Sequence, residues 1–199
     1  MEPLHPEFRK GDGLLLVDVQ QDFCAGGRLA VEGADEIVPL LNRWIEAALL
    51  DGLPIYASRD WHPVRHLSFR DQGGQWPPHC LADSDGARFH PDLRLPESAV
   101  IITKGVRFDQ DQNSVFDQTG FAHQLRHDGI KRLWVGGLAL DVCVLASVMD
   151  GLAEGFVMKL IAGATRPVTV EGGRNALRRM EEAGAQIVSL RGSQDVPNP

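Results

Sequence analysis

The chain has 199 residues, of which 43% are hydrophobic, and its formal net charge is −7 at pH 7. This length can bury a core without staples, and we expect residues 1–199 to form a single domain. Lys and Arg do not cluster, which argues against nucleic acid or an anionic membrane as a partner and favours a small molecule. The sequence shows neither a membrane span nor a signal peptide, so we expect a cytoplasmic protein.

Strands and helices are expected to alternate along the chain. The apolar run 13–19 is typical of a strand buried on both faces, and the apolar spacing in 35–50 predicts a helix. The further elements are strands 53–58 and 99–105, helix 118–128, strand 132–137, a helix that carries Val142 to Leu152, strand 156–162, helix 173–184 and strand 185–190. This order predicts an α/β fold of three layers, in which helices cover both faces of a mostly parallel, doubly wound sheet of about six strands.

Two regions lie outside this alternation, a glycine-containing turn at 24–33 and the long segment 60–98. The long segment holds four of the seven histidines of the chain. Segments of this length without regular structure are uncommon in compact domains and are usually functional or disordered. Because this segment is rich in Pro and Trp, we expect it to be an ordered loop. We also expect residues 60–98 to be a loop region that binds a metal ion.

Asp60 and His62 are two positions apart at the end of a predicted strand, so their side chains point to the same side. Pro63 keeps His62 extended, and two prolines stiffen the approach to His79, the candidate third ligand. One carboxylate and two imidazoles suit one Zn²⁺, Fe²⁺ or Mn²⁺ ion and leave coordination positions open. His66 is either a further ligand or a supporting group. The alternative for all these histidines is a structural role in turns.

Cys143 follows a predicted buried strand and is expected in the first turn of the next helix, with Asp141 as the N-cap. A helix N-terminus lowers the pKa of a thiol, and its N–H groups can bind an oxyanion. The alternative is a small apolar side chain packed between strand and helix. Cys24, Cys80 and Cys143 are an odd number without framework spacing, which predicts reduced thiols.

Asp18 and Lys104 each lie at the carboxyl end of a predicted strand. A charge in an apolar run is costly unless it is paired, and in a doubly wound sheet these strand ends line the ligand crevice. Together with Cys143 and Asp60, they predict a site at one edge of the sheet. The glycine turns match no nucleotide-binding motif, and GGLA at 136–139 instead allows close backbone approach beside the thiol.

Several of these segments resemble one known family. VDVQQDFCAGGRLAV at 17–31, SRDWHPVRHLSF followed by WPPHC, TKG at 103–105 and GLALDVCV at 137–144 are similar to the nicotinamidase (pyrazinamidase) branch of the isochorismatase-like cysteine hydrolases. The similarity extends from about residue 13 to residue 190 in the order of that family. It therefore implies the family's α/β fold for nearly the whole chain.

The resemblance also implies roles for individual residues. The implied catalytic triad is Asp18, Lys104 and Cys143, and the implied ligands of one divalent metal ion are Asp60, His62 and His79. A cis peptide bond between Leu138 and Ala139 is implied, as is an oxyanion hole formed by the N–H groups of Ala139 and Cys143. Pocket walls would be formed by Phe23, Leu29, Trp76 and Ala139. Position 142, often aromatic or His in the family, is Val here.

The activity implied by the resemblance is hydrolysis of nicotinamide, and also of pyrazinamide, to the acid and ammonia through a thioester on Cys143. In this mechanism Asp18 accepts the thiol proton. A metal ion orients the ring, and zinc is expected ahead of iron or manganese. Alternatives are a related amidase for another small amide or carbamoyl compound, a metal-hydroxide hydrolase with a structural Cys143, and a non-catalytic scaffold. The sequence does not decide the metal, the physiological role in NAD salvage, or whether the protein is a monomer or a homo-oligomer.

Overall fold

The computed structural model of the chain describes residues 6–189. Its centre is a six-stranded sheet in the order β3-β2-β1-β4-β5-β6, and each pair of neighbouring strands is parallel. The strands are β1 (Asp12–Val17), β2 (Ile55–Asp60), β3 (Val100–Lys104), β4 (Arg132–Leu138), β5 (Val157–Arg166) and β6 (Gln186–Val188). The predicted doubly wound sheet is confirmed, with the strand order that places a crevice between β1 and β4.

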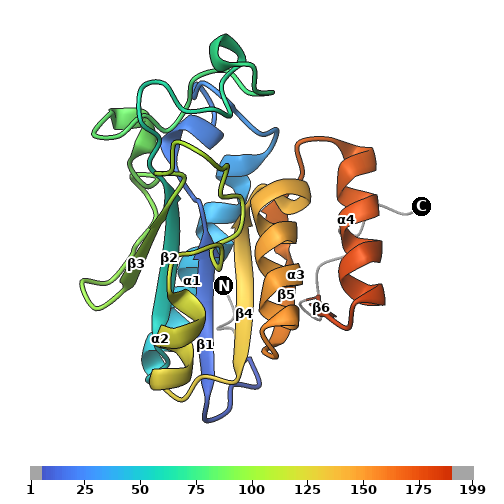
Figure 1. Cartoon of the computed structure of the whole chain (residues 1–199). Coiled ribbons are helices and arrows are strands. Elements are labelled where there is room, and N and C mark those ends of the chain that lie inside the picture. The colour runs from blue at the N-terminus through green and yellow to red at the C-terminus, as the bar shows by residue number, and fades with distance from the viewer. Residues whose placement is uncertain (1–5, 190–199) are drawn as a thin grey trace.

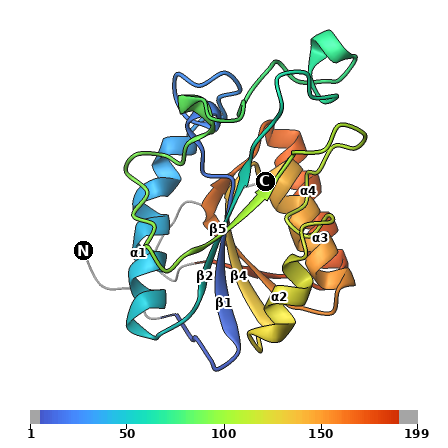
Figure 2. The ribbon, with the colours of Figure 1, turned by 60° about the vertical axis from the view of Figure 1, so that its left-hand side comes forward.

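Helices cover both faces of this sheet, which confirms the three layers. Figure 2 shows α1 on one face and the other helices on the opposite face. The α-helices are α1 (Val38–Leu50), α2 (Phe121–His127), α3 (Leu145–Ala153) and α4 (Val170–Glu182). Short 3-10 turns are η1 (Gln21–Phe23), η2 (Ala34–Ile37), η3 (Arg70–Gln72) and η4 (Asp85–Ala87), and η5 (Leu140–Val144) is a π-helical turn. Among the described residues, no helix is long and apolar enough to cross a bilayer.

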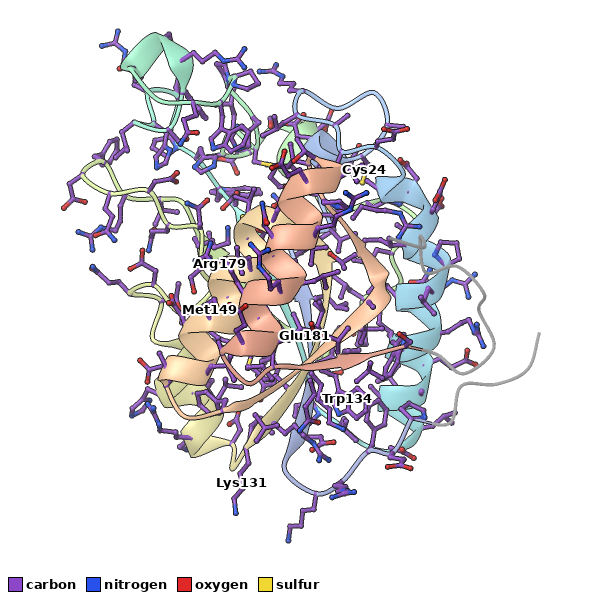
Figure 3. The ribbon with its side chains drawn as sticks, turned by 90° about the vertical axis from the view of Figure 1, so that its right-hand side faces the viewer. Cys24, Lys131, Trp134, Met149, Arg179 and Glu181 are labelled. Atoms are coloured by element: carbon purple, nitrogen blue, oxygen red, sulfur yellow. The ribbon has the colours of Figure 1, made fainter. Side chains whose placement is uncertain are left out.

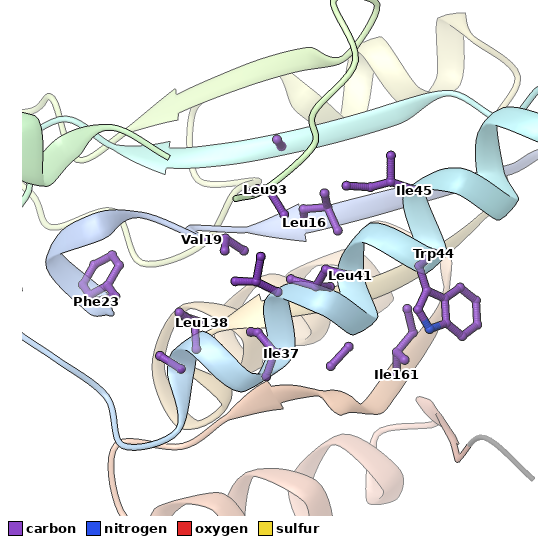
Figure 4. Close-up of a cluster of buried hydrophobic side chains, with 14 of the residues drawn as sticks. Leu16, Val19, Phe23, Ile37, Leu41, Trp44, Ile45, Leu93, Leu138 and Ile161 are labelled. Atoms are coloured by element: carbon purple, nitrogen blue, oxygen red, sulfur yellow. The ribbon is translucent and has the colours of Figure 1, made fainter. Parts of the chain in front are cut away.

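Side-chain alternation along β1 divides the core between the two faces. Leu14 and Leu16 belong to the cluster packed against α1, and Leu15 and Val17 belong to the cluster packed against the other helices. Figure 4 shows the α1 cluster, with Leu41 of the helix among its members. Each fully buried side chain of this kind contributes roughly 2 kcal/mol. The continuous apolar run therefore forms a strand because both of its faces are covered.

Several element boundaries differ from those predicted. The predicted strand 156–162 extends to Arg166, because β5 pairs again with β4 beyond a register shift between Val135 and Gly137. The predicted helix 173–184 starts earlier, at Val170, because the Thr169 hydroxyl accepts the N–H of the first turn. The predicted helix 35–50 begins as the 3-10 turn η2. The predicted strand 185–190 reaches beyond the described residues.

The parallel strands all end at one edge of the sheet, and long connections gather there. Figure 1 shows the segments that follow β1, β2 and β3 above this edge. In Figure 3, Cys24 marks the same end of the molecule and Lys131, which precedes β4, marks the opposite end. The carboxyl edge is therefore where side chains from distant parts of the chain meet.

Candidate active site

Three buried side chains with complementary chemistry meet at the carboxyl edge. We call them the thiol cluster: Asp18, Lys104 and Cys143. Asp18 directly follows β1, Lys104 is the last residue of β3, and Cys143 lies in η5 after β4. The Lys104 ammonium lies 2.8 Å from Asp18 Oδ2 and 3.5 Å from Cys143 Sγ. The structure thus brings together the three residues that the sequence assigned to catalysis.

Local backbone features hold these groups close to one another. Asp18 has a φ of 47°, which is rare for a residue with a side chain, and the Ser58 hydroxyl donates to its Oδ1 at 2.7 Å. At the end of β4, a Cβ on Gly137 would overlap the Val17 carbonyl of β1. The predicted close backbone approach therefore exists, and it brings the segment that carries Cys143 against the segment that carries Asp18.

The Lys104 ammonium also lies 2.6 Å from Asp60 Oδ1, so two carboxylates share one cation. Burial lowers the pKa of Lys104, but these carboxylates outweigh burial and raise its pKa well above the ordinary value. Burial raises the pKa of Asp18, and Lys104 does not cancel that effect. Burial also raises the pKa of Asp60, but Lys104 and His62 outweigh it and hold this pKa well below the ordinary value. Asp18 is thus poised to accept a proton while Asp60 stays ionised.

Two expectations about Cys143 were wrong. Burial raises the pKa of the Cys143 thiol well above its ordinary value, and this outweighs the lowering by Lys104, so the resting group is a neutral thiol. Asp141 is not an N-cap, because Ala139 occupies that position. The Asp141 carboxylate instead accepts the N–H groups of Val168 at 2.7 Å and Thr169 at 3.3 Å, which ties the start of α4 to η5.

The backbone that leads to Cys143 is irregular. The peptide bond between Leu138 and Ala139 is cis, as the resemblance implies. The Ala139 carbonyl accepts the N–H groups of Val142 and Val144, each at 3.1 Å. In a regular α-helix the same carbonyl would take the N–H of Cys143. Single π-turns of this kind are frequent at functional sites.

A second set of side chains, which we call the ligand cluster, comprises Asp60, His62 and His79. All three are buried, and their ligand atoms lie within 4.8 Å of one another. Nδ1 of His62 lies 2.9 Å from the Gly105 carbonyl, and Nδ1 of His79 lies 2.8 Å from the Pro77 carbonyl. A carbonyl only accepts, so both Nδ1 atoms carry a proton, and in the neutral rings each Nε2 is the atom that can bind a metal ion; Nε2 of His62 lies 3.6 Å from Asp60 Oδ2. This donor set fits a divalent metal ion with its supporting hydrogen bonds in place.

His66 lies beside the ligand cluster but outside it. Its ring stacks on His62 with the centroids 4.2 Å apart, and its Nδ1 faces the Ser68 hydroxyl at 2.7 Å. The Ser68 N–H also points at Nδ1, at 3.4 Å. This pattern differs from that of His62 and His79, whose Nδ1 atoms face carbonyls. Within the described part of the chain, His66 Nε2 has no hydrogen-bond partner.

A further group of metal-ligand residue types, Cys24, Asp35 and His90, lies in a separate pocket. Here the Asp92 N–H donates to His90 Nδ1 at 3.1 Å. His90 Nε2 therefore carries the ring proton and donates to Asp35 Oδ1 at 3.2 Å. The imidazole offers no free lone pair in this arrangement, so the group fits a metal ion less well than the ligand cluster does.

One pocket is shared by Cys143 of the thiol cluster and by the ligand cluster. Cys143 lines it together with all three members of the ligand cluster. The residues that the resemblance assigned to the pocket walls also line it, namely Phe23, Leu29, Trp76 and Ala139. A small molecule in this pocket would contact a thiol and a metal-ligand set at once.

Comparisons with known proteins agree with this arrangement. The family described as Isochorismatase domain matches residues 12–191. This chain belongs to the isochorismatase family. A nicotinamidase of Escherichia coli (strain K12) is 36% identical over 200 residues, which cover 89% of this chain and 94% of that protein.

Two solved structures are close to this isochorismatase-family chain. A pyrazinamidase of Pyrococcus horikoshii in complex with zinc is 40% identical, with a TM-score of 0.88, and the match covers 90% of this chain and 99% of that one. PnC1 from L. infantum in complex with nicotinate is 34% identical, with a TM-score of 0.83, and the match covers 89% and 92%. The family resemblance read from the sequence is confirmed.

Sequence reasoning missed several pocket residues of this isochorismatase-family chain. They are Val31, Ser68, Asp111, Asn113 and Val168. Asp111 and Asn113 come from the connection after β3, and no motif marks them in the sequence. Val142, where the sequence departs from the family resemblance, also lines the pocket.

Proposed function

We propose that this chain hydrolyses the carboxamide of nicotinamide to nicotinate and ammonia, and accepts pyrazinamide as well. The observation that carries this proposal is that Cys143 and the ligand cluster line the same pocket. A thiol nucleophile is suited to the carboxamide, and a metal-ligand set is suited to a ring nitrogen. The similarity to a nicotinamidase, to a zinc-bound pyrazinamidase and to a nicotinate complex supports the same substrate class.

The first half of the reaction forms a thioester. Asp18 accepts the proton of the Cys143 thiol, and the sulfur attacks the carboxamide carbon. The positive charge of Lys104 stabilises the thiolate as it forms. The N–H groups of Ala139 and Cys143 hold the oxyanion, and each donor of this type is worth ~3 kcal/mol in the transition state. Asp18 then gives its proton to the amine, and the C–N bond breaks to release ammonia.

The second half returns the enzyme to its resting state. Asp18, again ionised, accepts a proton from a water molecule that attacks the thioester carbon. The C–S bond breaks, nicotinate leaves, and the proton returns from Asp18 to Cys143. The raised pKa of Asp18 suits this double role, because burial keeps the carboxylate basic enough to take a proton.

Asp60, His62 and His79 would hold one divalent ion, with zinc proposed ahead of iron and manganese. When bound, the ion supplies a Lewis acid that accepts a lone pair such as that of a pyridine nitrogen. The chain keeps its ligands ready by holding Asp60 ionised beside Lys104 and by fixing both histidine rings through their Nδ1 atoms. The apolar walls at Phe23, Leu29 and Trp76 are suited to the faces and edges of an aromatic ring.

The deciding experiment measures ammonia release from nicotinamide, pyrazinamide, benzamide and a linear carbamoyl amide. We expect turnover of the first two, and loss of turnover in Cys143→Ala. Cys24→Ala is the matched control, because Cys24 is a buried free thiol outside this pocket and should leave activity intact. Chelation should remove activity, and zinc, iron and manganese are added back one at a time. Turnover of the carbamoyl amide without turnover of nicotinamide would overturn the proposal.

A further inference from the structure

Gln20 is a buried amide that lies outside both clusters and yet holds the backbone of Asp60. Its side chain is fully buried. The Asp60 N–H donates to Gln20 Oε1 at 2.8 Å, and Gln20 Nε2 donates to the Asp60 carbonyl at 2.8 Å. Nε2 also donates to the Ala87 carbonyl at 2.8 Å. One side chain thus binds both backbone groups of a ligand-cluster residue that is forty positions away.

These bonds replace strand pairing that β1 cannot provide. β1 ends at Val17, whereas β2 continues to Asp60. On its other side, Asp60 pairs with Lys104 of β3. Without Gln20, the backbone of Asp60 would lack a partner on the β1 side, at the point where its side chain must keep a fixed direction. The amide therefore continues the hydrogen bonding on the β1 side of β2 up to Asp60 through a side chain.

The bond to Ala87 connects the same amide to the loop that follows His79. Asp22, two residues after Gln20, accepts the Cys80 N–H at 2.7 Å, directly beside His79. A Cβ on Gly86 would overlap the Asp22 carboxylate, so this loop packs closely against the segment after β1. The short segment that carries Gln20 and Asp22 is thus hydrogen-bonded both to Asp60 at the end of β2 and to the loop that carries His79.

We propose that Gln20 is a positioning residue that sets the affinity of the ligand cluster for a divalent ion. It does so by fixing the Asp60 backbone, and therefore the direction of the Asp60 carboxylate toward His62 and Lys104. The inference rests on the proposed function only for the assignment of the ion to this cluster. A purely structural Gln20 would affect the free energy of unfolding but not the affinity of the folded protein for metal.

The test measures the zinc affinity of the full-length wild-type chain and of two variants. Each protein is first stripped of metal, and its affinity is then measured by competition with a chromophoric chelator. Gln20→Met keeps the side-chain size and removes all three hydrogen bonds. Asn42→Leu is the matched control, because the Asn42 amide also bonds two backbone groups, accepting the Arg94 N–H at 2.8 Å and donating to the Asp92 carbonyl at 2.8 Å, and it lies in α1, none of whose residues lines the pocket with Cys143. Cobalt-substituted protein gives an absorption spectrum that reports the ligand geometry independently of activity.

We expect Gln20→Met to weaken zinc binding about 10- to 100-fold, the usual range for a lost supporting contact, and to alter the cobalt spectrum. Asn42→Leu should leave both unchanged. Should Gln20→Met fail to fold, Gln20→Glu, which keeps the length but loses both donor bonds, takes its place with the same expected direction. Equal zinc affinity in wild type and the folded Gln20 variant would overturn the inference. Zinc binding without nicotinamide turnover would instead count against the proposed function alone.

Discussion

Lys104 and Asp60 form a buried ion pair, with Nζ 2.6 Å from Oδ1, and this pair joins the thiol cluster to the ligand cluster. The same ammonium lies 2.8 Å from Asp18. Its charge therefore acts on Asp18, the proposed proton acceptor, and on a ligand-cluster residue at once. The consequence is that the two clusters are one electrostatic unit, although their residues come from different strands.

Replacing Lys104 should disable both clusters. In Lys104→Met, Asp18 and Asp60 lose their shared cation, and the loss of one partner from a buried pair costs about 3–5 kcal/mol. We expect a loss of that size in denaturant unfolding, together with no detectable ammonia release. Lys131→Met is the control, because Lys131 is exposed at the opposite end of the sheet and should change stability by less than about 0.5 kcal/mol. Wild-type turnover in Lys104→Met would contradict the assigned role.

Removing the Ser58 hydroxyl should move the acidic side of the pH–activity profile. The Ser58 hydrogen bond lowers the pKa of Asp18 against the larger raising effect of burial. Without it the pKa rises further, so the base is protonated, and activity lost, at a higher pH than in wild type. A hydrogen bond of about 1 kcal/mol corresponds to a shift of roughly 0.7 pH units. The profile of kcat/KM for Ser58→Ala measures it.

Ser147→Ala is the control for Ser58→Ala. Ser147 is equally buried, and its hydroxyl accepts the Val115 N–H at 3.0 Å, away from Asp18. The Ser147→Ala variant should have a lower free energy of unfolding than wild type but the same pH–activity profile. Identical profiles in Ser58→Ala and wild type would show that Ser58 does not tune the base.

Tyr56 should make the protein sensitive to alkaline pH. Burial raises the pKa of Tyr56, and its hydrogen bond to Asp128 Oδ2 at 2.9 Å adds to this. The fold favours the neutral phenol, so its contribution is complete below the unfolded pKa of about 10 and is lost as the pH rises above that value. Tyr56→Phe should lose about 1 kcal/mol at neutral pH but show a weaker decline in alkali. Because this is the only tyrosine of the chain, tyrosinate absorbance reports it directly. A phenol that ionises near pH 10 in the folded state would disprove this.

Gly105→Ala should disturb His62. Gly105 has a φ of 69°, and a Cβ there would overlap the His62 ring. Gly120→Ala is a matched control, because Gly120 has a φ of 78° and open space around the added Cβ. Both variants should lose about 1–2 kcal/mol from backbone strain, but only Gly105→Ala should also weaken metal binding, measured by chelator competition. Equal metal affinity in both variants would show that the ring adjusts without cost.

The sequence by itself determined the features that follow from local rules. Alternation of strands and helices predicted the three-layer fold, because periodicity reports which faces of an element are buried. Asp60 and His62 share a side because residues two apart in a strand do so. Asp18, Lys104 and Cys143 were placed at one edge because parallel strands end together.

Only the tertiary structure decided how these groups interact. The raised pKa of the Cys143 thiol follows from burial, which outweighs the lowering of this pKa by Lys104. The ligand atoms of His79, Asp60 and His62 lie within 4.8 Å of one another, whereas Nδ1 of His66 faces the Ser68 hydroxyl. The amide of Gln20 reaches Asp60 across forty residues. Such contacts depend on strand order and on how long loops pack, and local sequence patterns carry no information about either.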